Sequence, residues 1–168
     1  MEHEKIKTFL FEDDGKIPNN PKFPLIIYPE AFVDRIADYE QVLHGNNWTN
    51  SWKGSVFDYH HFHSNTHEAL VVDSGTAVIQ FGGANGQTIK VAAGDVIVIP
   101  AGVGHKRLEA SNDFQVMGAY PDGRNHDLLT GTPKEREKAI ENIKNVPVPD
   151  TDPVFAEEGP LQDIWMGM

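Results

Sequence analysis

Short runs of β-branched and aromatic residues dominate the chain between residues 54 and 121. Turns such as Asp73-Ser74-Gly75 and Pro100-Ala101-Gly102 separate these runs, and this punctuation is typical of strands. The predicted strands are Ala69–Val72, Thr76–Phe81, Thr88–Val91, Val96–Ile99 and Phe114–Tyr120. Because no helical pattern lies between them, they predict an all-β antiparallel sandwich or barrel.

A helical pattern precedes this region, within an N-terminal extension that spans residues 1–53. Apolar residues recur at helical spacing between Pro29 and His44, and Gly45 follows as a stop signal. The pattern predicts one amphipathic helix that packs on a larger body.

A second helix is predicted at the start of the C-terminal region, residues 132–168. Thr132-Pro133-Lys134-Glu135 is a capping box with proline at the first helical position,, and the helix should end before Pro147. The remaining tail is acidic and rich in proline. We expect it to cross the surface as an extended arm, anchored by Phe155, Ile164 and Trp165.

Length and charge narrow the classes of protein. The 168 residues fit a single domain,, and we take residues 1–168 as one. The formal net charge of −11 argues against nucleic acid and anionic lipid as partners. We expect a cytoplasmic protein with no membrane association, because the first twenty residues lack a signal-peptide pattern and no segment approaches the roughly 20 apolar residues of a membrane helix.

The histidines carry the first sign of chemistry. There are eight, and four of them (His60, His61, His63 and His67) fall within eight consecutive residues, whereas cysteine is absent. A metal would therefore be held by nitrogen and oxygen ligands. His61 and His63 point the same way if they lie on a strand, and a turn after them could bring Glu68 back beside the two imidazoles.

A second segment can complete this set. Gly94 is followed by a five-residue run, then by Pro100, Gly102 and His105. The proline and glycine turn the chain, and His105 starts the next strand. If that strand lines the same interior, the chain offers three histidines and one glutamate to one metal ion.

Together, His61-Phe62-His63-(four)-Glu68-(six)-Gly75 and Gly94-(five)-Pro100-x-Gly102-(two)-His105 resemble the two motifs of the cupin superfamily. The resemblance implies a double-sheet jelly-roll (cupin) barrel with a few flanking helices, and metal ligands at His61, His63, Glu68 and His105. The flanking segments, including Tyr59–Ser64 and Asp152-Pro153-Val154, further resemble a small uncharacterised bacterial cupin family (YjlB-like).

The chain departs from the superfamily pattern in two places. Six residues rather than five separate Gly54 from His61, which a bulge could absorb,. Glu109 stands where the family tends to have asparagine.

Three further residues are candidates for acid–base or anchoring roles. Tyr59 shares parity with His61, so its hydroxyl could contact a ligand, although core packing is the commoner fate of an aromatic residue. Arg107 and Glu109 share parity with His105. An inward Arg107 needs Glu109 or an anionic substrate as a partner, and an outward, solvated Arg107 remains open.

The other histidines receive different expectations. His67 neighbours Glu68 and is the main rival ligand, but strand parity points it to the opposite face, where we expect a surface position or a supporting contact. His60 also has the opposite parity and is expected at the surface or an interface. His126, in a loop, could close over the site.

Three histidines and one carboxylate leave about two positions of an octahedral ion free for substrate. We expect a divalent transition metal (Fe, Mn, Ni, Co, Zn or Cu) in a metal-dependent enzyme of the oxygenase or isomerase type that acts on a small polar molecule. The alternatives are a non-catalytic module that binds a small ligand or a metal, and a structural jelly roll with vestigial ligands. Family resemblance also suggests a homodimer.

Overall fold

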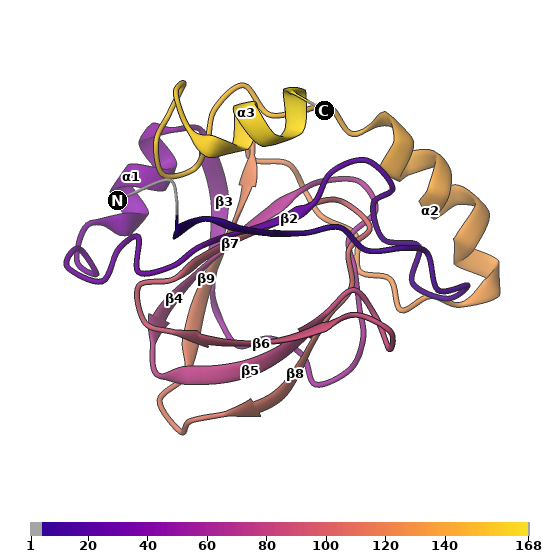
Figure 1. Cartoon of the computed structure of the whole chain (residues 1–168), viewed down its shortest axis with the longest axis horizontal. Coiled ribbons are helices and arrows are strands. Elements are labelled where there is room, and N and C mark those ends of the chain that lie inside the picture. The colour runs from indigo at the N-terminus through magenta and orange to yellow at the C-terminus, as the bar shows by residue number, and fades with distance from the viewer. Residues whose placement is uncertain (1–4, 168) are drawn as a thin grey trace.

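The computed structural model describes residues 5–167. Within them, strands form two antiparallel sheets that face each other (Figure 1). The six-stranded sheet has the order β1-β2-β7-β4-β9-β3, and the three-stranded sheet the order β6-β5-β8. The predicted double-sheet jelly roll is confirmed. The strands are β1 Lys7–Phe9, β2 Leu25–Tyr28, β3 Trp48–Gly54, β4 Glu68–Ser74, β5 Thr76–Phe81, β6 Gln87–Ala92, β7 Val96–Ile99, β8 His105–Ala110 and β9 Gln115–Pro121.

The five predicted strands correspond to β4, β5, β6, β7 and β9, and β8 begins at His105 as expected. The sequence pattern did not predict the three strands of the N-terminal extension. Of these, β3 pairs with β9, and β2 pairs with β7. The N-terminal region therefore completes the large sheet instead of merely packing on it.

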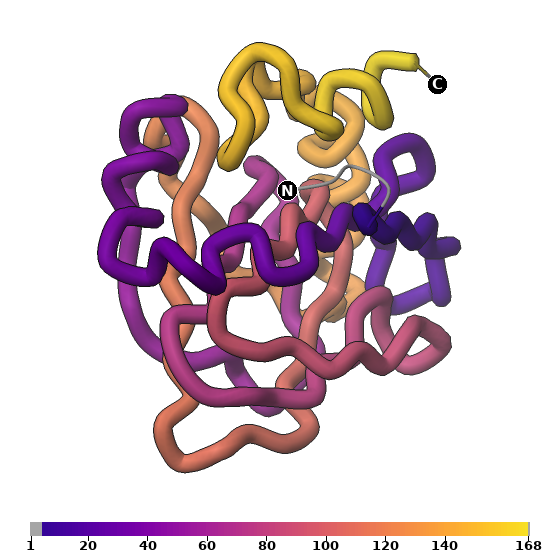
Figure 2. Tube along the Cα trace, turned by 60° about the vertical axis from the view of Figure 1, so that its left-hand side comes forward, coloured from indigo at the N-terminus to yellow at the C-terminus, as the bar shows by residue number. Residues whose placement is uncertain are grey.

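Side chains of the large sheet are buried on both faces, which explains its near-continuous apolar strands. On β4, Leu70 and Val72 face the small sheet and pack with Ile79. Ala69 and Val71 face the opposite side and belong to a second apolar cluster that includes Trp165. Figures 1 and 2 show the C-terminal segment on this second side, away from the small sheet.

The N-terminal helix is much shorter than its pattern predicted. Helix α1 spans only Tyr39–Gly45, and residues 29–38 form turns. Glu30 has a positive φ of 59°, which is incompatible with an α-helix,. The Phe32 N–H donates to the Gly94 carbonyl at 2.8 Å. This contact ties the segment to the β6–β7 turn, so tertiary structure overrides the helical periodicity.

At the C-terminus, helix α2 spans Pro133–Asn145 and has the predicted capping box. The following tail is not an extended arm throughout, because Pro160–Met166 forms helix α3. Trp165 of this helix is buried and stacks on Phe23. Within residues 5–167, none of the helices has the length and apolar character needed to cross a bilayer.

His67 illustrates what the tail does to the outer face of the large sheet. Parity points its side chain away from Glu68, as predicted, but the position is fully buried and not at the surface. Its Nδ1 accepts a hydrogen bond from the Ala101 N–H at 2.9 Å, and its Nε2 donates to the Pro147 carbonyl at 3.0 Å. Both ring nitrogens are therefore used by the backbone, and the ring is neutral.

This neutral histidine should make folding stability depend on pH. Burial lowers the pKa of His67 to about 3, whereas the unfolded chain has the ordinary value of about 6.5. The unfolded state then binds a proton that the folded state rejects. The stabilising contribution is complete above pH 6.5 and is lost by up to about 1.4 kcal/mol per pH unit as the pH falls from there towards 3.

Urea unfolding of the wild type and of His67→Gln between pH 4 and 7 measures this effect. We expect the difference in unfolding free energy between the two proteins to shrink as the pH falls. His44→Gln, at an exposed position, is the control for replacing a histidine with glutamine. A pH-independent difference for His67→Gln would contradict the assignment.

Candidate metal centre

A cluster of polar side chains lies at one end of the interface between the two sheets. Each sheet supplies one residue to it. Glu68 begins β4 of the large sheet and His105 begins β8 of the small sheet. His61 forms an isolated bridge with His105, in which each backbone N–H donates to the other residue's carbonyl, at 3.2 and 2.9 Å. This bridge brings His63 beside Glu68, as the motif spacing predicted.

Three potential ligand atoms converge in this cluster. The Nε2 atom of His63 lies 3.3 Å from Oε1 of Glu68, and Nε2 of His105 lies 3.6 Å from the same oxygen. All three residues are buried, and their ligand atoms lie within 4.8 Å of one another. Two atoms bound to one ion at about 2.1 Å lie about 3.0 Å apart at a right angle and about 3.4 Å apart at a tetrahedral angle. The cluster therefore has dimensions close to those of a metal site.

Backbone carbonyls orient the imidazoles. The Nδ1 atom of His61 faces the Tyr59 carbonyl at 2.9 Å, and Nδ1 of His105 faces the Val103 carbonyl at 3.2 Å. Nδ1 of His63 faces the Asp127 carbonyl in the same way. A carbonyl only accepts hydrogen bonds, so Nδ1 carries the proton in each ring. The Nε2 lone pairs are left for a cation, which is the tautomer that metal-binding histidines commonly adopt.

His61 is close to this cluster but is not part of its closest group. Its ring centroid lies 4.0 Å from that of His105 and 6.1 Å from that of His63. Among the described residues, the group within 4.8 Å consists of His63, Glu68 and His105. The side chain of His61 is nevertheless buried and lines the same cavity. Its role as a fourth ligand remains a prediction.

Charge in the cluster favours a bound cation. Burial alone would raise the pKa of the Glu68 carboxyl, but the charge and hydrogen bond of His63 outweigh it and lower the pKa. Burial likewise opposes protonation of His63, but Glu68 raises the pKa of that ring. Burial, followed by the neighbouring histidines, holds the pKa of His105 well below its usual range. The cluster thus accommodates one positive charge next to one carboxylate, either as a proton or as a metal ion.

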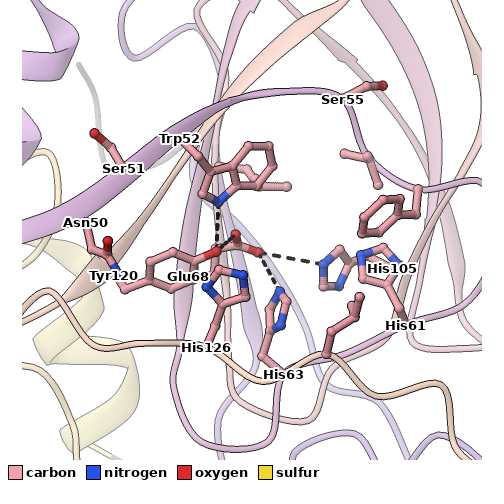
Figure 3. Close-up of a pocket in the computed structure, with 14 residues that line it drawn as sticks. Asn50, Ser51, Trp52, Ser55, His61, His63, Glu68, His105, Tyr120 and His126 are labelled. Atoms are coloured by element: carbon pink, nitrogen blue, oxygen red, sulfur yellow. Dashed lines mark hydrogen bonds and ion pairs between the residues drawn. The ribbon is translucent and has the colours of Figure 1, made fainter.

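Two aromatic residues that the sequence analysis missed hold Glu68 in place (Figure 3). The Tyr120 hydroxyl donates to Oε2 of Glu68 at 2.8 Å, and the indole N–H of Trp52 donates to the Tyr120 oxygen at 2.8 Å. A Cβ at Gly118 would lie 2.5 Å from the Trp52 ring, so a glycine is needed where this indole packs. Oε1 of Glu68 is left to face the histidines.

A cavity of about 350 Å³ opens beside the cluster. Its lining includes Trp52, Tyr120 and the four motif residues, together with apolar side chains from several elements. His126 also lines it and stacks on Tyr120 at 4.6 Å between ring centroids. The prediction that His126 could close over the site thus agrees with its position beside the cavity.

Comparison with known proteins places the chain in a family. A profile of the cupin domain matches residues 48–114. Over 166 residues the chain is 51% identical to the Bacillus subtilis (strain 168) protein called uncharacterized protein YjlB, with 99% of each chain covered. The chain belongs to the YjlB-like cupin family.

Solved structures are similar to this cupin at lower sequence identity. A DUF861 family protein from Thermotoga maritima is 20% identical, with 57% of this chain and 96% of that chain covered and a TM-score of 0.34. A mutant of Bacillus subtilis oxalate decarboxylase is 18% identical, with 66% and 24% covered and a TM-score of 0.37. The WlaRB TDP-quinovose 3,4-ketoisomerase from Campylobacter jejuni is 16% identical, with 56% and 74% covered and a TM-score of 0.41. Such scores are too low to transfer an activity to this cupin.

The three predicted acid–base or anchoring residues of the cupin are not among the residues that line the cavity. Tyr59 is 40% exposed and stacks on Phe57. Arg107 donates to the Ser55 hydroxyl at 2.8 Å, next to the cavity. Glu109 is exposed, and an irregularity in the β5–β8 pairing breaks the parity that would align it with His105. Their roles in catalysis remain predictions.

His60 is half-buried rather than fully solvated. Its Nδ1 atom is buried without a hydrogen-bond partner, and the residue lines a separate polar hollow with Lys16 and Lys106. The structure therefore keeps His60 apart from the cluster, as parity predicted.

Motif spacing does not reveal Tyr120, Trp52 or Asp127. Each of them contacts a partner more than 50 positions away in the sequence. Trp52 and Tyr120, for example, share a hydrogen bond although 68 positions separate them. Strand parity is the one available signal, because Tyr120 shares its face of β9 with Val116, which packs between the sheets.

Proposed function

We propose that this cupin holds one divalent transition metal ion through His61, His63, Glu68 and His105, and that it is an enzyme of the oxygenase or isomerase type. The substrate is a small molecule with a polar, oxygen-bearing end that enters the cavity. The single observation that carries the proposal is the convergence of two Nε2 atoms on one carboxylate oxygen, at 3.3 and 3.6 Å. Any of Fe, Mn, Ni, Co, Zn or Cu accepts these ligands.

A bound ion would act as a Lewis acid on a substrate oxygen or, if it is redox-active, would exchange electrons with the substrate. The chain's own residues prepare the site. The carbonyls that hold each Nδ1–H fix the ring orientation, and Tyr120 holds the carboxylate of Glu68. Apolar side chains in the lining exclude water from the reacting groups,.

The experiment is a turnover screen of the metal-loaded protein with diols, keto acids and sugars. Oxygen uptake reports oxygenation, and loss of substrate without oxygen uptake reports isomerisation. The matched control is Glu68→Gln, which should remove any activity that depends on the site. Turnover unaffected by Glu68→Gln would contradict the proposal. A tightly bound ligand without turnover would favour the non-catalytic binding module.

We further propose that the protein is cytoplasmic and forms a homodimer. β1 is an edge strand of the large sheet, where a second copy could add its own strand. Light scattering of the purified protein tests this: a mass of two chains supports it, and a mass of one chain contradicts it.

A further inference from the structure

The wall of the cavity that faces the cluster is largely carbon. In Figure 3, Trp52 lies on the opposite side of the space from the histidines. Val56, Phe57, Leu70 and Leu128 also line this space, and they come from the segment after β3, from β4 and from the loop after β9. Asn50, Ser51 and Ser55 add polar groups to the same lining. A ligand bound to the cluster would therefore place its remaining atoms against apolar side chains.

The apolar wall continues to the outside of the molecule. Phe57 is 48% exposed and Leu128 is 44% exposed although both line the cavity, and Phe57 stacks on the exposed ring of Tyr59. Large apolar side chains that gather at a cavity mouth are a common mark of a binding site. Covering them with an apolar group would release water at about 25 cal/mol per Å².

Charge points to the same kind of ligand. Glu68 is the acidic residue of the lining, and neither lysine nor arginine is among the described residues that line the cavity. Arg107 donates to the Ser55 hydroxyl from outside the lining. A carboxylate or phosphate on the far end of a substrate would lose its water without a lysine or arginine in the lining to bind it, which is costly.

We propose that the substrate is a small molecule with a neutral, apolar body of ring size and one oxygen-bearing end that faces His63, Glu68 and His105. The cavity of about 350 Å³ holds about a dozen atoms at the roughly 30 Å³ that a water molecule occupies. This inference rests on the proposed metal centre and specifies the substrate class for it: oxygenated aromatic or branched alkyl compounds, not dicarboxylates or sugar phosphates.

Three hydroxamates test the inference, because they share one chelating head and differ in the tail. The cobalt(II)-loaded protein is titrated with benzohydroxamate, acetohydroxamate and succinic acid monohydroxamate, and the visible spectrum of cobalt reports binding. Affinities of the same probes for free cobalt(II) correct for the chelating head. We expect benzohydroxamate to bind at least tenfold more tightly than acetohydroxamate, and the carboxylate-tailed probe to bind most weakly.

A charge introduced at the mouth provides the matched variant. Leu128→Lys should improve binding of the carboxylate-tailed probe at least tenfold relative to benzohydroxamate. Leu10→Lys, at an exposed leucine away from this cavity, should leave the order unchanged. Equal affinities for the three tails, or a preference for the carboxylate tail in the wild type, would overturn the inference while leaving the metal centre intact. Failure to bind cobalt would overturn both.

Discussion

Replacing Glu68 with glutamine is expected to weaken metal binding at least 100-fold without unfolding the protein. Glu68 is the one acid in the cluster, and its Oε1 lies within 3.6 Å of the Nε2 atoms of His63 and His105. Loss of a supporting contact at a metal site typically costs 10–100-fold in affinity, so loss of a charged ligand should cost at least as much. Glutamine keeps the shape and can still accept the hydrogen bond from Tyr120.

Competition with a chelator of known affinity measures this effect, and the melting temperature in excess chelator checks the fold. Glu137→Gln is the matched control, because Glu137 is exposed and away from the cavity. We expect wild-type affinity for that variant. If Glu68→Gln keeps wild-type affinity, the ion binds elsewhere.

Replacing Asp152 with alanine should lower the free energy of unfolding by about 4 kcal/mol. This fully buried carboxylate accepts hydrogen bonds from the Tyr28 hydroxyl at 2.6 Å and from the backbone N–H of Leu161 at 3.1 Å. It also accepts from the N–H groups of Val154 and Phe155, at 2.8 and 3.0 Å. Hydrogen bonds to a charged group contribute about 1.5–3 kcal/mol each, and buried donors left without partners cost more.

Asp152 joins the tail to β2 and to the start of α3, so its loss should also loosen the cover over the outer face of the large sheet. At about 2–4 °C per kcal/mol for a chain of this size, the melting temperature should fall by about 10 °C. Asp150→Ala, at an exposed position two residues earlier, should shift it by little. A shift for Asp152→Ala as small as that of the control would show that the tail does not depend on this carboxylate.

Local patterns predicted the central strands because each of them satisfies the pattern within a few residues. Val96–Ile99 is apolar throughout, with a glycine turn before it and a proline after it, and the structure forms β7 there. The helix predicted from Pro29 does not form over its first turns, because that segment depends on contacts with distant residues. Its first turns are held by distant partners, such as the Gly94 carbonyl that binds the Phe32 N–H.

The tail shows the same limit. Acidic residues and prolines predicted an extended arm anchored by Trp165. Trp165 does pack into the core, but the arm forms helix α3 over Pro160–Met166. The tail also contains Asp152, which accepts hydrogen bonds from four donors. The sequence does not reveal this set, because one donor, Tyr28, lies 124 positions away.

The residues of the candidate site also differ in whether local sequence patterns predict them. Strand alternation and turn spacing were sufficient to bring His63, Glu68 and His105 together. Tyr120 and Trp52, which position Glu68, come from strands that pair with each other only in the folded sheet. Spacing arguments therefore found the atoms that converge in the cluster and missed the residues that orient them.

The metal content of the purified protein tests the central claim most directly. The protein should be expressed with added transition metals, purified without chelators and analysed for its elements. We predict about one ion per chain in the wild type and loss of that ion in Glu68→Gln. Less than about 0.1 ion per chain in the wild type after such supplementation would contradict the metal centre.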